Sequence, residues 1–306
     1  MSKAINHVLI TGVAGFIGSN LLDYLLEKTS WNICGIDDLS TGHLRNIQGH
    51  LKNPRFEFCQ FSCWDVKSLK PYDCIFHLAA LPRIQPSFEL VNDHIRANLL
   101  SSTHILERMI VENHFPRFVF SSSSAIYGTP EIIPTPESEK FNCLSPYAFQ
   151  KYEVERYLEL LSTRFPFDYV NLRYFNPYGP RSFNPENKFN AYSSVVGIFL
   201  HQKKTGKKLL ITGDGSQKRD FIHVYDVAGA NLAAAIFPGT LNTSFNIGHG
   251  STISILELAK LISSEFEFIP KREGEAEITF ANIDKAQKIL GWRPIHPLKD
   301  YLKTAG

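Results

Sequence analysis

The chain has 306 residues, of which 43% are hydrophobic and 20% are charged, and its formal net charge is only +2. This length suffices for one large domain or two closely joined ones, and this composition argues against wholesale disorder. No basic block is present, so a nucleic acid is not expected as a partner, whereas a small anionic ligand needs only a few placed cations.

Short β-rich runs alternate with helical patterns in the first half of the chain. Strands are expected at residues 7–11, 31–36, 55–61, 74–78, 117–121 and 167–174, and helices at 16–28, 88–113 (entered after Pro86) and 146–164. Nearly continuous apolar strands that alternate with helices indicate a parallel sheet covered on both faces. The expected fold class is therefore α/β, a doubly wound (Rossmann) sheet that binds ligands at the carboxyl ends of its strands.

The character of the sequence changes after Tyr174. Residues 176–187 are rich in Pro and Asn and are expected to form a loop. Shorter elements follow: helices near 193–204, 224–236, 253–264 and 283–290, and a strand at 209–212. This half predicts a smaller, mixed α/β region that binds the substrate.

A glycine-rich turn follows the first strand and opens the first helix. Gly12 permits a tight turn, Gly15 lets the backbone approach a pyrophosphate, and Gly18 lets helix and strand pack closely. The free N–H groups at the helix start, around Phe16 and Ile17, can receive negative charge. Because the turn stands between a strand and a helix, it predicts a dinucleotide site rather than a packing feature.

Asp37 stands nineteen residues after Gly18, at the end of the second strand. A carboxylate there can accept hydrogen bonds from the adenosine ribose and would repel a 2′-phosphate, which favours NAD over NADP. The alternative interpretation is an aspartate that caps a turn.

Tyr147 and Lys151 lie one helical turn apart on the predicted helix 146–164. A nearby ammonium lowers the pKa of a phenol, so Tyr147 could act as a general base. Such a pair is by itself compatible with an exposed helix face, and the four serines at 121–124 with a turn. Strand 117–121, however, delivers these hydroxyls to the sheet edge where the dinucleotide is expected, which favours a catalytic set.

Several segments resemble the extended short-chain dehydrogenases/reductases, and within them the NAD-dependent nucleotide-sugar epimerase/dehydratase family, including 4-epimerases of UDP-glucose and UDP-N-acetylglucosamine. These segments are 11–18 (TGVAGFIG), 77–80 (HLAA), 121–128 (SSSSAIYG), 147–151 (YAFQK), 172–176 (LRYFN), 213–223 (GDGSQKRDFIH), 245–248 (FNIG), 272–275 (REGE) and 285–292 (KAQKILGW). The resemblance covers nearly the whole chain in the right order.

The resemblance implies roles for individual residues. It makes Tyr147 the catalytic base, Lys151 its partner on the nicotinamide ribose, and Ser123 the hydroxyl that bonds the sugar oxygen. The implied NAD contacts are Gly12, Gly15, Phe16, Ile17, Gly18, Asp37, Leu78, Ala79, Ala80, Asn98, Tyr147, Lys151 and Tyr174. The implied nucleotide-sugar contacts are Arg83, Ser123, Ser124, Asn176, Ser194, Arg219, Arg272 and Glu275.

Two arginines also suit a diphosphate on chemical grounds, because guanidinium groups bind it through paired hydrogen bonds. A solvated surface arginine is the alternative for each. We expect residues 1–175 and 220–248 to form the NAD-binding domain, and 176–219 and 249–306 the nucleotide-sugar-binding region.

The reaction is narrowed by what stands after Ser123. Relatives that dehydrate or decarboxylate the sugar carry an acidic residue there, whereas this chain has Ser124 and Ala125. The expected activity is therefore a 4-epimerase, which takes a hydride from C4 and returns it to the other face of a 4-keto sugar. A net dehydrogenase or reductase acting at C4 shares the same catalytic residues and stays open. A 4,6-dehydratase is disfavoured, and a non-catalytic NAD sensor would have no reason to keep the Ser123, Tyr147 and Lys151 set.

The nucleotide, uridine or guanosine, and the sugar are left open by the sequence. Thr279 falls near the family position whose size gates bulky N-acetyl groups, and a residue of this size leaves N-acetylhexosamines open. Arg83 departs from the family pattern. Its side chain could bind a carboxylate group of the sugar, or it could form a salt bridge at the start of a helix. Ser62 stands where many relatives have an Asp that contacts adenine.

The five cysteines, in mostly apolar contexts, predict buried free thiols, and no metal site is expected. Without a signal-peptide pattern or a membrane-length apolar run, we expect a cytoplasmic protein. The resemblance also implies a homodimer, paired through the helices at 88–113 and 146–164.

Overall fold

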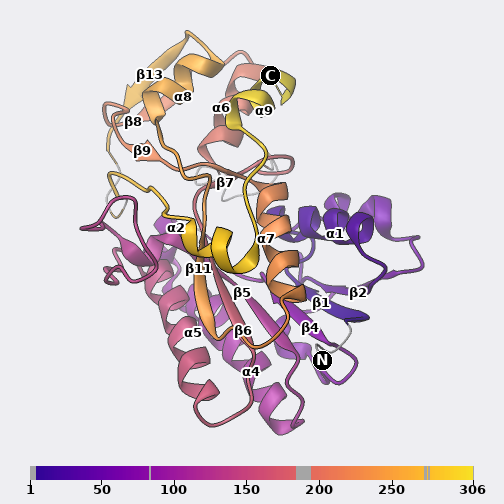
Figure 1. Ribbon diagram of the computed structural model, residues 1–306. Helices are drawn as coiled ribbons and strands as arrows, with labels where there is room; N and C mark the ends of the chain where they lie inside the picture. The colour runs from indigo at the N-terminus through magenta and orange to yellow at the C-terminus, as the bar shows by residue number, and fades with distance from the viewer. Residues whose placement is uncertain (1–4, 83, 184–193, 272–273, 275, 306) are drawn as a thin grey trace.

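The computed structural model describes residues 5–82, 84–183, 194–271, 274 and 276–305. Its centre is a seven-stranded, fully parallel sheet with the strand order β3-β2-β1-β4-β5-β6-β11 (Figure 1). The strands are β1 (His7–Thr11), β2 (Asn32–Ile36), β3 (Phe56–Cys59), β4 (Cys74–His77), β5 (Arg117–Ser123), β6 (Tyr169–Tyr174) and β11 (Thr243–Ile247). The predicted doubly wound fold is confirmed. Its strand order reverses between β1 and β4, where such folds bind their ligands.

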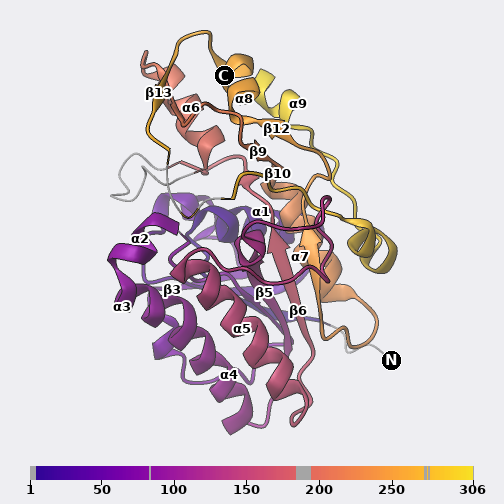
Figure 2. The same cartoon turned by 90° about the vertical axis from the view of Figure 1, so that its left-hand side faces the viewer.

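The sheet is buried on both faces because its strands are apolar on both sides. In β1, Val8 and Ile10 face the core under one helix layer, and Leu9 faces the core under the other. One layer contains α1 (Phe16–Lys28) and α7 (Val224–Ile236), which pack against each other. Figure 2 shows the other layer, with α4 (Ser101–Val111) and α5 (Pro146–Ser162) side by side in front of the sheet.

The long helix predicted at 88–113 is confirmed over residues 91–111, but its pitch changes along the way and a separate helix precedes it. Residues 84–111 contain α2 (Ile84–Glu89), α3 (Val91–His94), the π-helical segment η4 (Ile95–Leu100) and α4. Asn98 turns its amide to Leu81 in the loop after β4, and the Ser101 and Ser102 hydroxyls donate to carbonyls four residues earlier. These bonds compete with the regular helical ladder, which explains the local change of pitch.

A smaller region stands above the carboxyl ends of the strands (Figure 1). Its helices are α6 (Val195–Lys204), α8 (Ile255–Ile262) and α9 (Leu298–Ala305). Its strands form three pairs: β7 (Pro177–Tyr178) with β10 (Ile222–His223), β9 (Lys218–Arg219) with β12 (Ile253–Ser254), and β8 (Leu209–Thr212) with β13 (Phe266–Ile269). The region has its own core, in which residues such as Phe199, Ile211 and Leu258 are fully buried. The predicted small mixed region is thereby confirmed.

Several elements of the second half differ from the prediction, among them β13, α9 and the two-residue strands, which the sequence analysis does not expect. Strand β11 completes the large sheet beside β6, although the segment reads as a family motif rather than as a strand. The helix expected at 283–290 is a π-helical segment, Ala286–Leu290 (η7), which ends at Gly291 with φ 64°.

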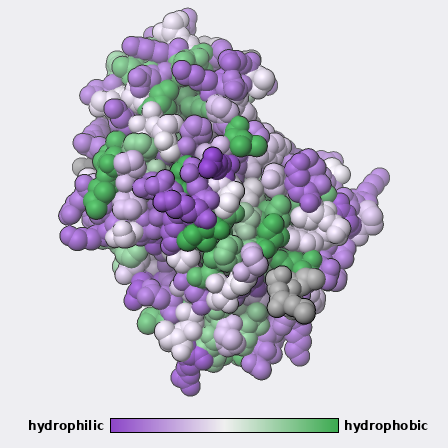
Figure 3. All heavy atoms as spheres, viewed as in Figure 1, coloured by the Kyte–Doolittle hydropathy of each residue, from purple (hydrophilic) through white to green (hydrophobic). Residues whose placement is uncertain are grey.

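The surface seen in Figure 1 alternates short clusters of hydrophobic side chains with hydrophilic ones (Figure 3). Among the residues that the structure describes, no helix is both long enough and apolar enough to cross a membrane.

Candidate active site

A cavity of about 1110 Å³ runs along the carboxyl ends of the central strands, between the sheet and the smaller region. Ligand pockets usually measure about 300–1,000 Å³. The cavity therefore has room for a dinucleotide together with a second ligand. Its wall contains residues from the turn after β1 at one end and from β8 and α6 at the other.

The glycine-rich turn forms the wall at the strand-order reversal. Gly12 has φ 71°, and a Cβ built on it would lie 2.8 Å from the Cα and N of Ala79. A Cβ on Gly18 would lie 2.1 Å from the carbonyl oxygen of Gly12. Gly15 caps α1 without a side chain and lines the cavity together with Phe16 and Ile17. The first turn of α1 therefore presents backbone to the cavity, which is the geometry that receives a phosphate.

A buried hydrogen-bond chain fixes this turn against the end of β4. The Thr11 hydroxyl oxygen accepts from the backbone N–H groups of Leu78 and Ala79, and it lies 2.9 Å from Nδ1 of His77. Because that oxygen accepts twice, its proton goes to Nδ1, and Nε2 of His77 donates to Ser102 at 2.9 Å. Burial lowers the pKa of His77 to about 3, with a smaller effect from the charge of Lys151. His77 is thus a neutral structural link and not an acid or base of the site.

Asp37 lies at the end of β2 and lines the cavity beside Asp38. Its carboxylate accepts from the N–H groups of Ala14 at 2.9 Å and Leu39 at 2.8 Å. Burial raises the pKa of Asp37, and these two hydrogen bonds partly offset the effect. Two carboxylates at this end disfavour a ligand with a further phosphate there.

Ser123, Tyr147 and Lys151 lie in the wall of this same cavity, at the carboxyl end of β5 and the start of α5. Ser145 caps α5 by accepting from the N–H of Ala148, and the N–H of Tyr147 donates to the Ser87 hydroxyl at 3.2 Å. These bonds fix the first turn of α5, so the half-buried Tyr147 side chain starts from a constrained backbone.

Lys151 is buried, and its ammonium donates to the carbonyl of Ser121 at 2.7 Å and lies 4.8 Å from the centre of the Phe120 ring. Burial lowers the pKa of Lys151 to about 7, although the charge of Glu155 acts in the opposite direction. The Ser123 oxygen accepts from the N–H of Ala125 at 3.2 Å, which leaves its hydroxyl proton available to a ligand.

A buried ion pair supports this wall from behind and was not predicted. Arg173 donates to both carboxylate oxygens of Glu155, at 3.0 and 2.7 Å, and also to the Tyr127 hydroxyl. Ser122 donates to the same carboxylate, so the pair ties β5, β6 and α5 together directly behind the cavity. In the sequence, this ion pair is indicated only by the position of Arg173 and Tyr127 inside motifs that resemble the family.

The far end of the cavity is assembled from segments that are distant in sequence. Asn176 donates to the Thr279 hydroxyl at 2.8 Å and to the carbonyl of Asp220 at 2.9 Å, and both Asn176 and Thr279 line the cavity. Arg219 lines it as well, and its guanidinium donates to the carbonyl of Lys218. Ser194 lines it from the start of α6.

Asp220 holds this end in place without lining the cavity. Its buried carboxylate accepts from the N–H groups of His249 at 2.7 Å, Ala281 at 3.0 Å and Gly250 at 3.1 Å. Burial raises the pKa of Asp220 to about 7, and the three hydrogen bonds partly offset this rise.

Comparison with known proteins shows the family of the chain. Residues 8–248 match the family described as the NAD dependent epimerase/dehydratase family. The chain belongs to this family. A curated relative from Methanocaldococcus jannaschii, named a putative UDP-glucose 4-epimerase, is 35% identical, and the match covers 97% of this chain and 96% of the relative.

Two solved structures share the fold closely. The UDP-glucose 4-epimerase of Thermotoga maritima, in complex with UDP-glucose, has a TM-score of 0.88 and 34% identity and covers 98% of this chain and 97% of its own. The UDP-glucuronic acid 4-epimerase of Bacillus cereus, in complex with UDP-glucuronic acid and NAD, has a TM-score of 0.88 and 30% identity and covers 97% of this chain and 96% of its own.

NAD is the cofactor of this family enzyme, and the geometry fits it. The space beside Gly12 and Gly18, which a Cβ on either residue would fill, would receive the pyrophosphate, and Asp37 would accept hydrogen bonds from the adenosine ribose. NADP, the alternative, would put its 2′-phosphate against Asp37 and Asp38.

The structure brings most of the predicted site residues of this epimerase/dehydratase family member to one cavity. Those that line it are Gly12, Gly15, Phe16, Ile17, Gly18, Asp37, Leu78, Ala79, Ala80, Ser123, Ser124, Tyr147, Lys151, Tyr174, Asn176, Ser194 and Arg219. Asn98 does not line it; its amide binds Leu81 and Gln150 behind the wall, so it positions the loop after β4. Arg83, Arg272 and Glu275 lie outside the described residues.

Proposed function

We propose that the protein is an NAD-dependent 4-epimerase of a UDP-linked sugar. The observation that carries this proposal is the composition of the catalytic wall. It holds Ser123, Tyr147 and Lys151, whereas the next two positions, Ser124 and Ala125, line the cavity with no carboxyl group. Elimination of water or of carbon dioxide needs an acid or base at those positions, and epimerisation does not. The curated relative and the Thermotoga maritima structure, both named for UDP-glucose, support uridine as the nucleotide.

The catalytic side chains divide the work by their chemistry. Tyr147 removes the proton of the sugar 4-hydroxyl, and the Lys151 ammonium stabilises the phenolate that does so. Ser123 donates a hydrogen bond to the same sugar oxygen, which positions it against Tyr147. Bound NAD supplies the hydride acceptor for C4 and then the donor to the opposite face of the 4-keto sugar.

The two ends of the cavity serve the two ligands in this proposal. Residues 1–175 and 220–248, which include all seven strands of the large sheet, bind NAD. Residues 176–219 and 249–306 bind the nucleotide sugar, with Asn176 and Arg219 at the diphosphate. Arg83, Arg272 and Glu275 stay predicted contacts of that ligand.

We also propose a homodimer paired through α4 and α5. Apolar side chains on these two neighbouring helices are exposed, with Val111 at 66%, Phe149 at 51% and Leu160 at 59%. Exposed apolar surface on adjacent helices favours association with a like surface. Light scattering at micromolar concentration should give twice the chain mass, and a monomeric mass would contradict the proposal.

The deciding experiment incubates the purified protein with UDP-glucose, UDP-N-acetylglucosamine, UDP-glucuronic acid and a GDP-linked hexose. Sugar products and NADH absorbance are followed together. An epimerase converts one of these sugars to its C4 epimer with no net NADH. Stoichiometric NADH with an oxidised sugar would instead establish a dehydrogenase, and loss of water would establish a dehydratase.

A further inference from the structure

The turn after β7 carries an arginine where glycine is the favoured residue. The N–H of Ser182 donates to the carbonyl of Gly179 at 3.2 Å, which closes a turn over Pro180 and Arg181. Arg181 has φ 68°, the left-handed region that the third position of a type II turn requires and that Gly occupies without strain. A side chain that stands in a strained backbone position needs a compensating role.

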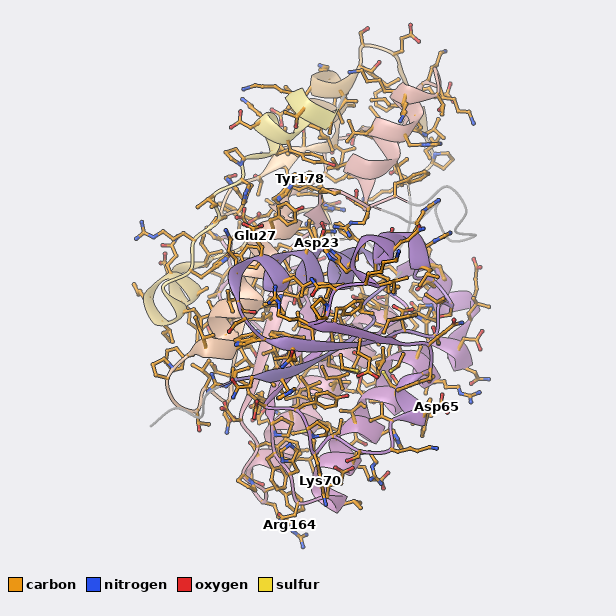
Figure 4. All side chains as sticks on the ribbon, turned by 90° about the vertical axis from the view of Figure 1, so that its right-hand side faces the viewer. Asp23, Glu27, Asp65, Lys70, Arg164 and Tyr178 are labelled. Carbon is orange, nitrogen blue, oxygen red and sulfur yellow. The ribbon has the colours of Figure 1, made fainter. Side chains whose placement is uncertain are left out.

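The Arg181 side chain reaches across to the phosphate-binding half of the molecule. Its guanidinium donates to the carbonyl of Asn46 at 2.8 Å and to the amide oxygen of Asn20 at 3.0 Å, and it forms an ion pair with Asp23. Asn20 returns a hydrogen bond from its amide nitrogen to the carbonyl of Pro180 at 3.0 Å. Figure 4 shows Asp23 on the side of α1 that faces the β7 segment, where Tyr178 is labelled.

These contacts fasten the segment that encloses one end of the cavity. Asn46 donates to the carbonyl of Ala14 at 2.8 Å, and the N–H of His43 donates to that same carbonyl at 3.0 Å, so residues 37–50 fold over the glycine-rich turn. Asp23 also binds Nε2 of His50 at 2.6 Å. The cavity-lining members of this segment are Asp37, Asp38, Ser40, Thr41, Gly42 and Asn46.

We propose that Arg181 is a positioning residue that retains bound NAD. It bridges the turn after β7, on the nucleotide-sugar side, to α1 and to the segment 37–50 on the adenosine side. While this bridge is closed, the dinucleotide cannot leave the phosphate-binding turn without breaking contacts between the two halves of the molecule. Retention also serves a reaction that regenerates its cofactor in place. The proposal rests on NAD binding and not on which sugar reacts.

The test is Arg181→Gly, which removes the guanidinium and at the same time relieves the backbone at φ 68°. The turn should therefore stay folded, so loss of the fold cannot imitate the expected result. The NAD content of the purified protein is measured after acid release, and the NAD dissociation rate by trapping with excess labelled NAD. Neither measurement needs a sugar.

We expect Arg181→Gly to release NAD about 10- to 100-fold faster, because two charge-assisted hydrogen bonds and a partly exposed ion pair are lost. Turnover should return to the wild-type value when NAD is added in excess. Asp23→Asn should give a smaller effect that is not additive with Arg181→Gly.

Arg108→Ala is the matched control, because Arg108 on α4 likewise pairs with one carboxylate, Glu112, and one backbone carbonyl, that of Lys67, outside the cavity wall. Its NAD content should match the wild type. Wild-type NAD content and dissociation rate in Arg181→Gly would overturn the proposal. A second result would also overturn it: NAD stays bound to Arg181→Gly, but turnover is lost and excess NAD does not restore it. Arg181 would then act on the nucleotide sugar and not on NAD. A protein that retains NAD but converts no sugar would refute the proposed function and leave this test intact.

Discussion

The two ends of the cavity are built in different ways. The proposed phosphate-binding end is made of backbone: Gly12, Gly15 and Gly18 follow one another within seven residues, and a Cβ on Gly12 or Gly18 would collide with neighbouring backbone. The other end, which we propose binds the nucleotide sugar (the sugar end), is made of side chains and loops from three distant segments, around Asn176, Asp220 and Thr279. A ligand common to a whole family can be held by a local backbone motif, whereas a ligand that varies is held by parts that can change separately.

Between these two ends stands the catalytic wall, where the largest effect is expected. Tyr147→Phe should lower kcat by about 10²- to 10⁴-fold, because the variant lacks the base that we propose takes the 4-hydroxyl proton. NAD content should stay at the wild-type level, since the phosphate-binding end is untouched. Tyr152→Phe is the control, because Tyr152 packs against Phe141 outside the cavity wall. Unchanged turnover in Tyr147→Phe would remove Tyr147 from the mechanism.

The backbone character of the phosphate-binding end is tested by Gly12→Ala. A Cβ there would lie 2.8 Å from the backbone of Ala79, in a residue with φ 71°. We expect NAD affinity to fall about 10- to 100-fold, measured by fluorescence titration. Gly49→Ala is the control, because a Cβ on Gly49 meets nothing within 4 Å. Equal NAD affinity in both variants would show that the turn tolerates a side chain.

The side-chain character of the sugar end is tested by Thr279→Tyr. A larger residue at this position should fill space beside Asn176 and exclude an N-acetyl group. The ratio of kcat/KM for UDP-N-acetylglucosamine to that for UDP-glucose should fall about 10-fold or more. Thr279→Val keeps the size but removes the hydroxyl that accepts from Asn176, so an equal fall in that variant would mean that size is not the cause.

The last prediction concerns stability and not turnover or binding. The pKa of Asp220 is about 7 in the folded protein and 3.8 for the free group, so the folded state binds more protons between these values. The contribution of Asp220 to stability is therefore full below pH 3.8 and declines as pH rises toward 7.

Urea unfolding of the wild type and of Asp220→Asn at pH 5 and pH 8 measures this contribution. The free energy of unfolding of the wild type, relative to that of the variant, should fall by about 2–3 kcal/mol from pH 5 to pH 8. Groups shared by both proteins, such as the histidines, cancel in the difference. A difference that is constant with pH would mean that Asp220 titrates in its ordinary range.

Long-range features explain where prediction from the sequence failed. The helix expected at 88–113 has the right apolar pattern, but Asn98 makes a bond with Leu81 that no local pattern reveals. The family resemblance implies that Asn98 contacts NAD, whereas its amide binds Leu81 and Gln150 behind the cavity wall. The pairing of β11 with β6 and the Arg181 bridge likewise depend on which distant segments meet. Arg181, for example, binds Asp23, which is 158 residues away in the sequence.

The sequence by itself determined the alternation of strands and helices, the phosphate-binding turn, and the Ser123, Tyr147 and Lys151 set. In each case the chemistry lies within one turn or one strand end, so spacing along the chain equals proximity in space. The tertiary structure decided the wall around these residues: the neutral state of His77, the Arg173–Glu155 pair, the Asp220 anchor and the Arg181 bridge. Those features join groups from separate segments, and their burial and hydrogen bonds exist only once the sheet and the smaller region have folded together.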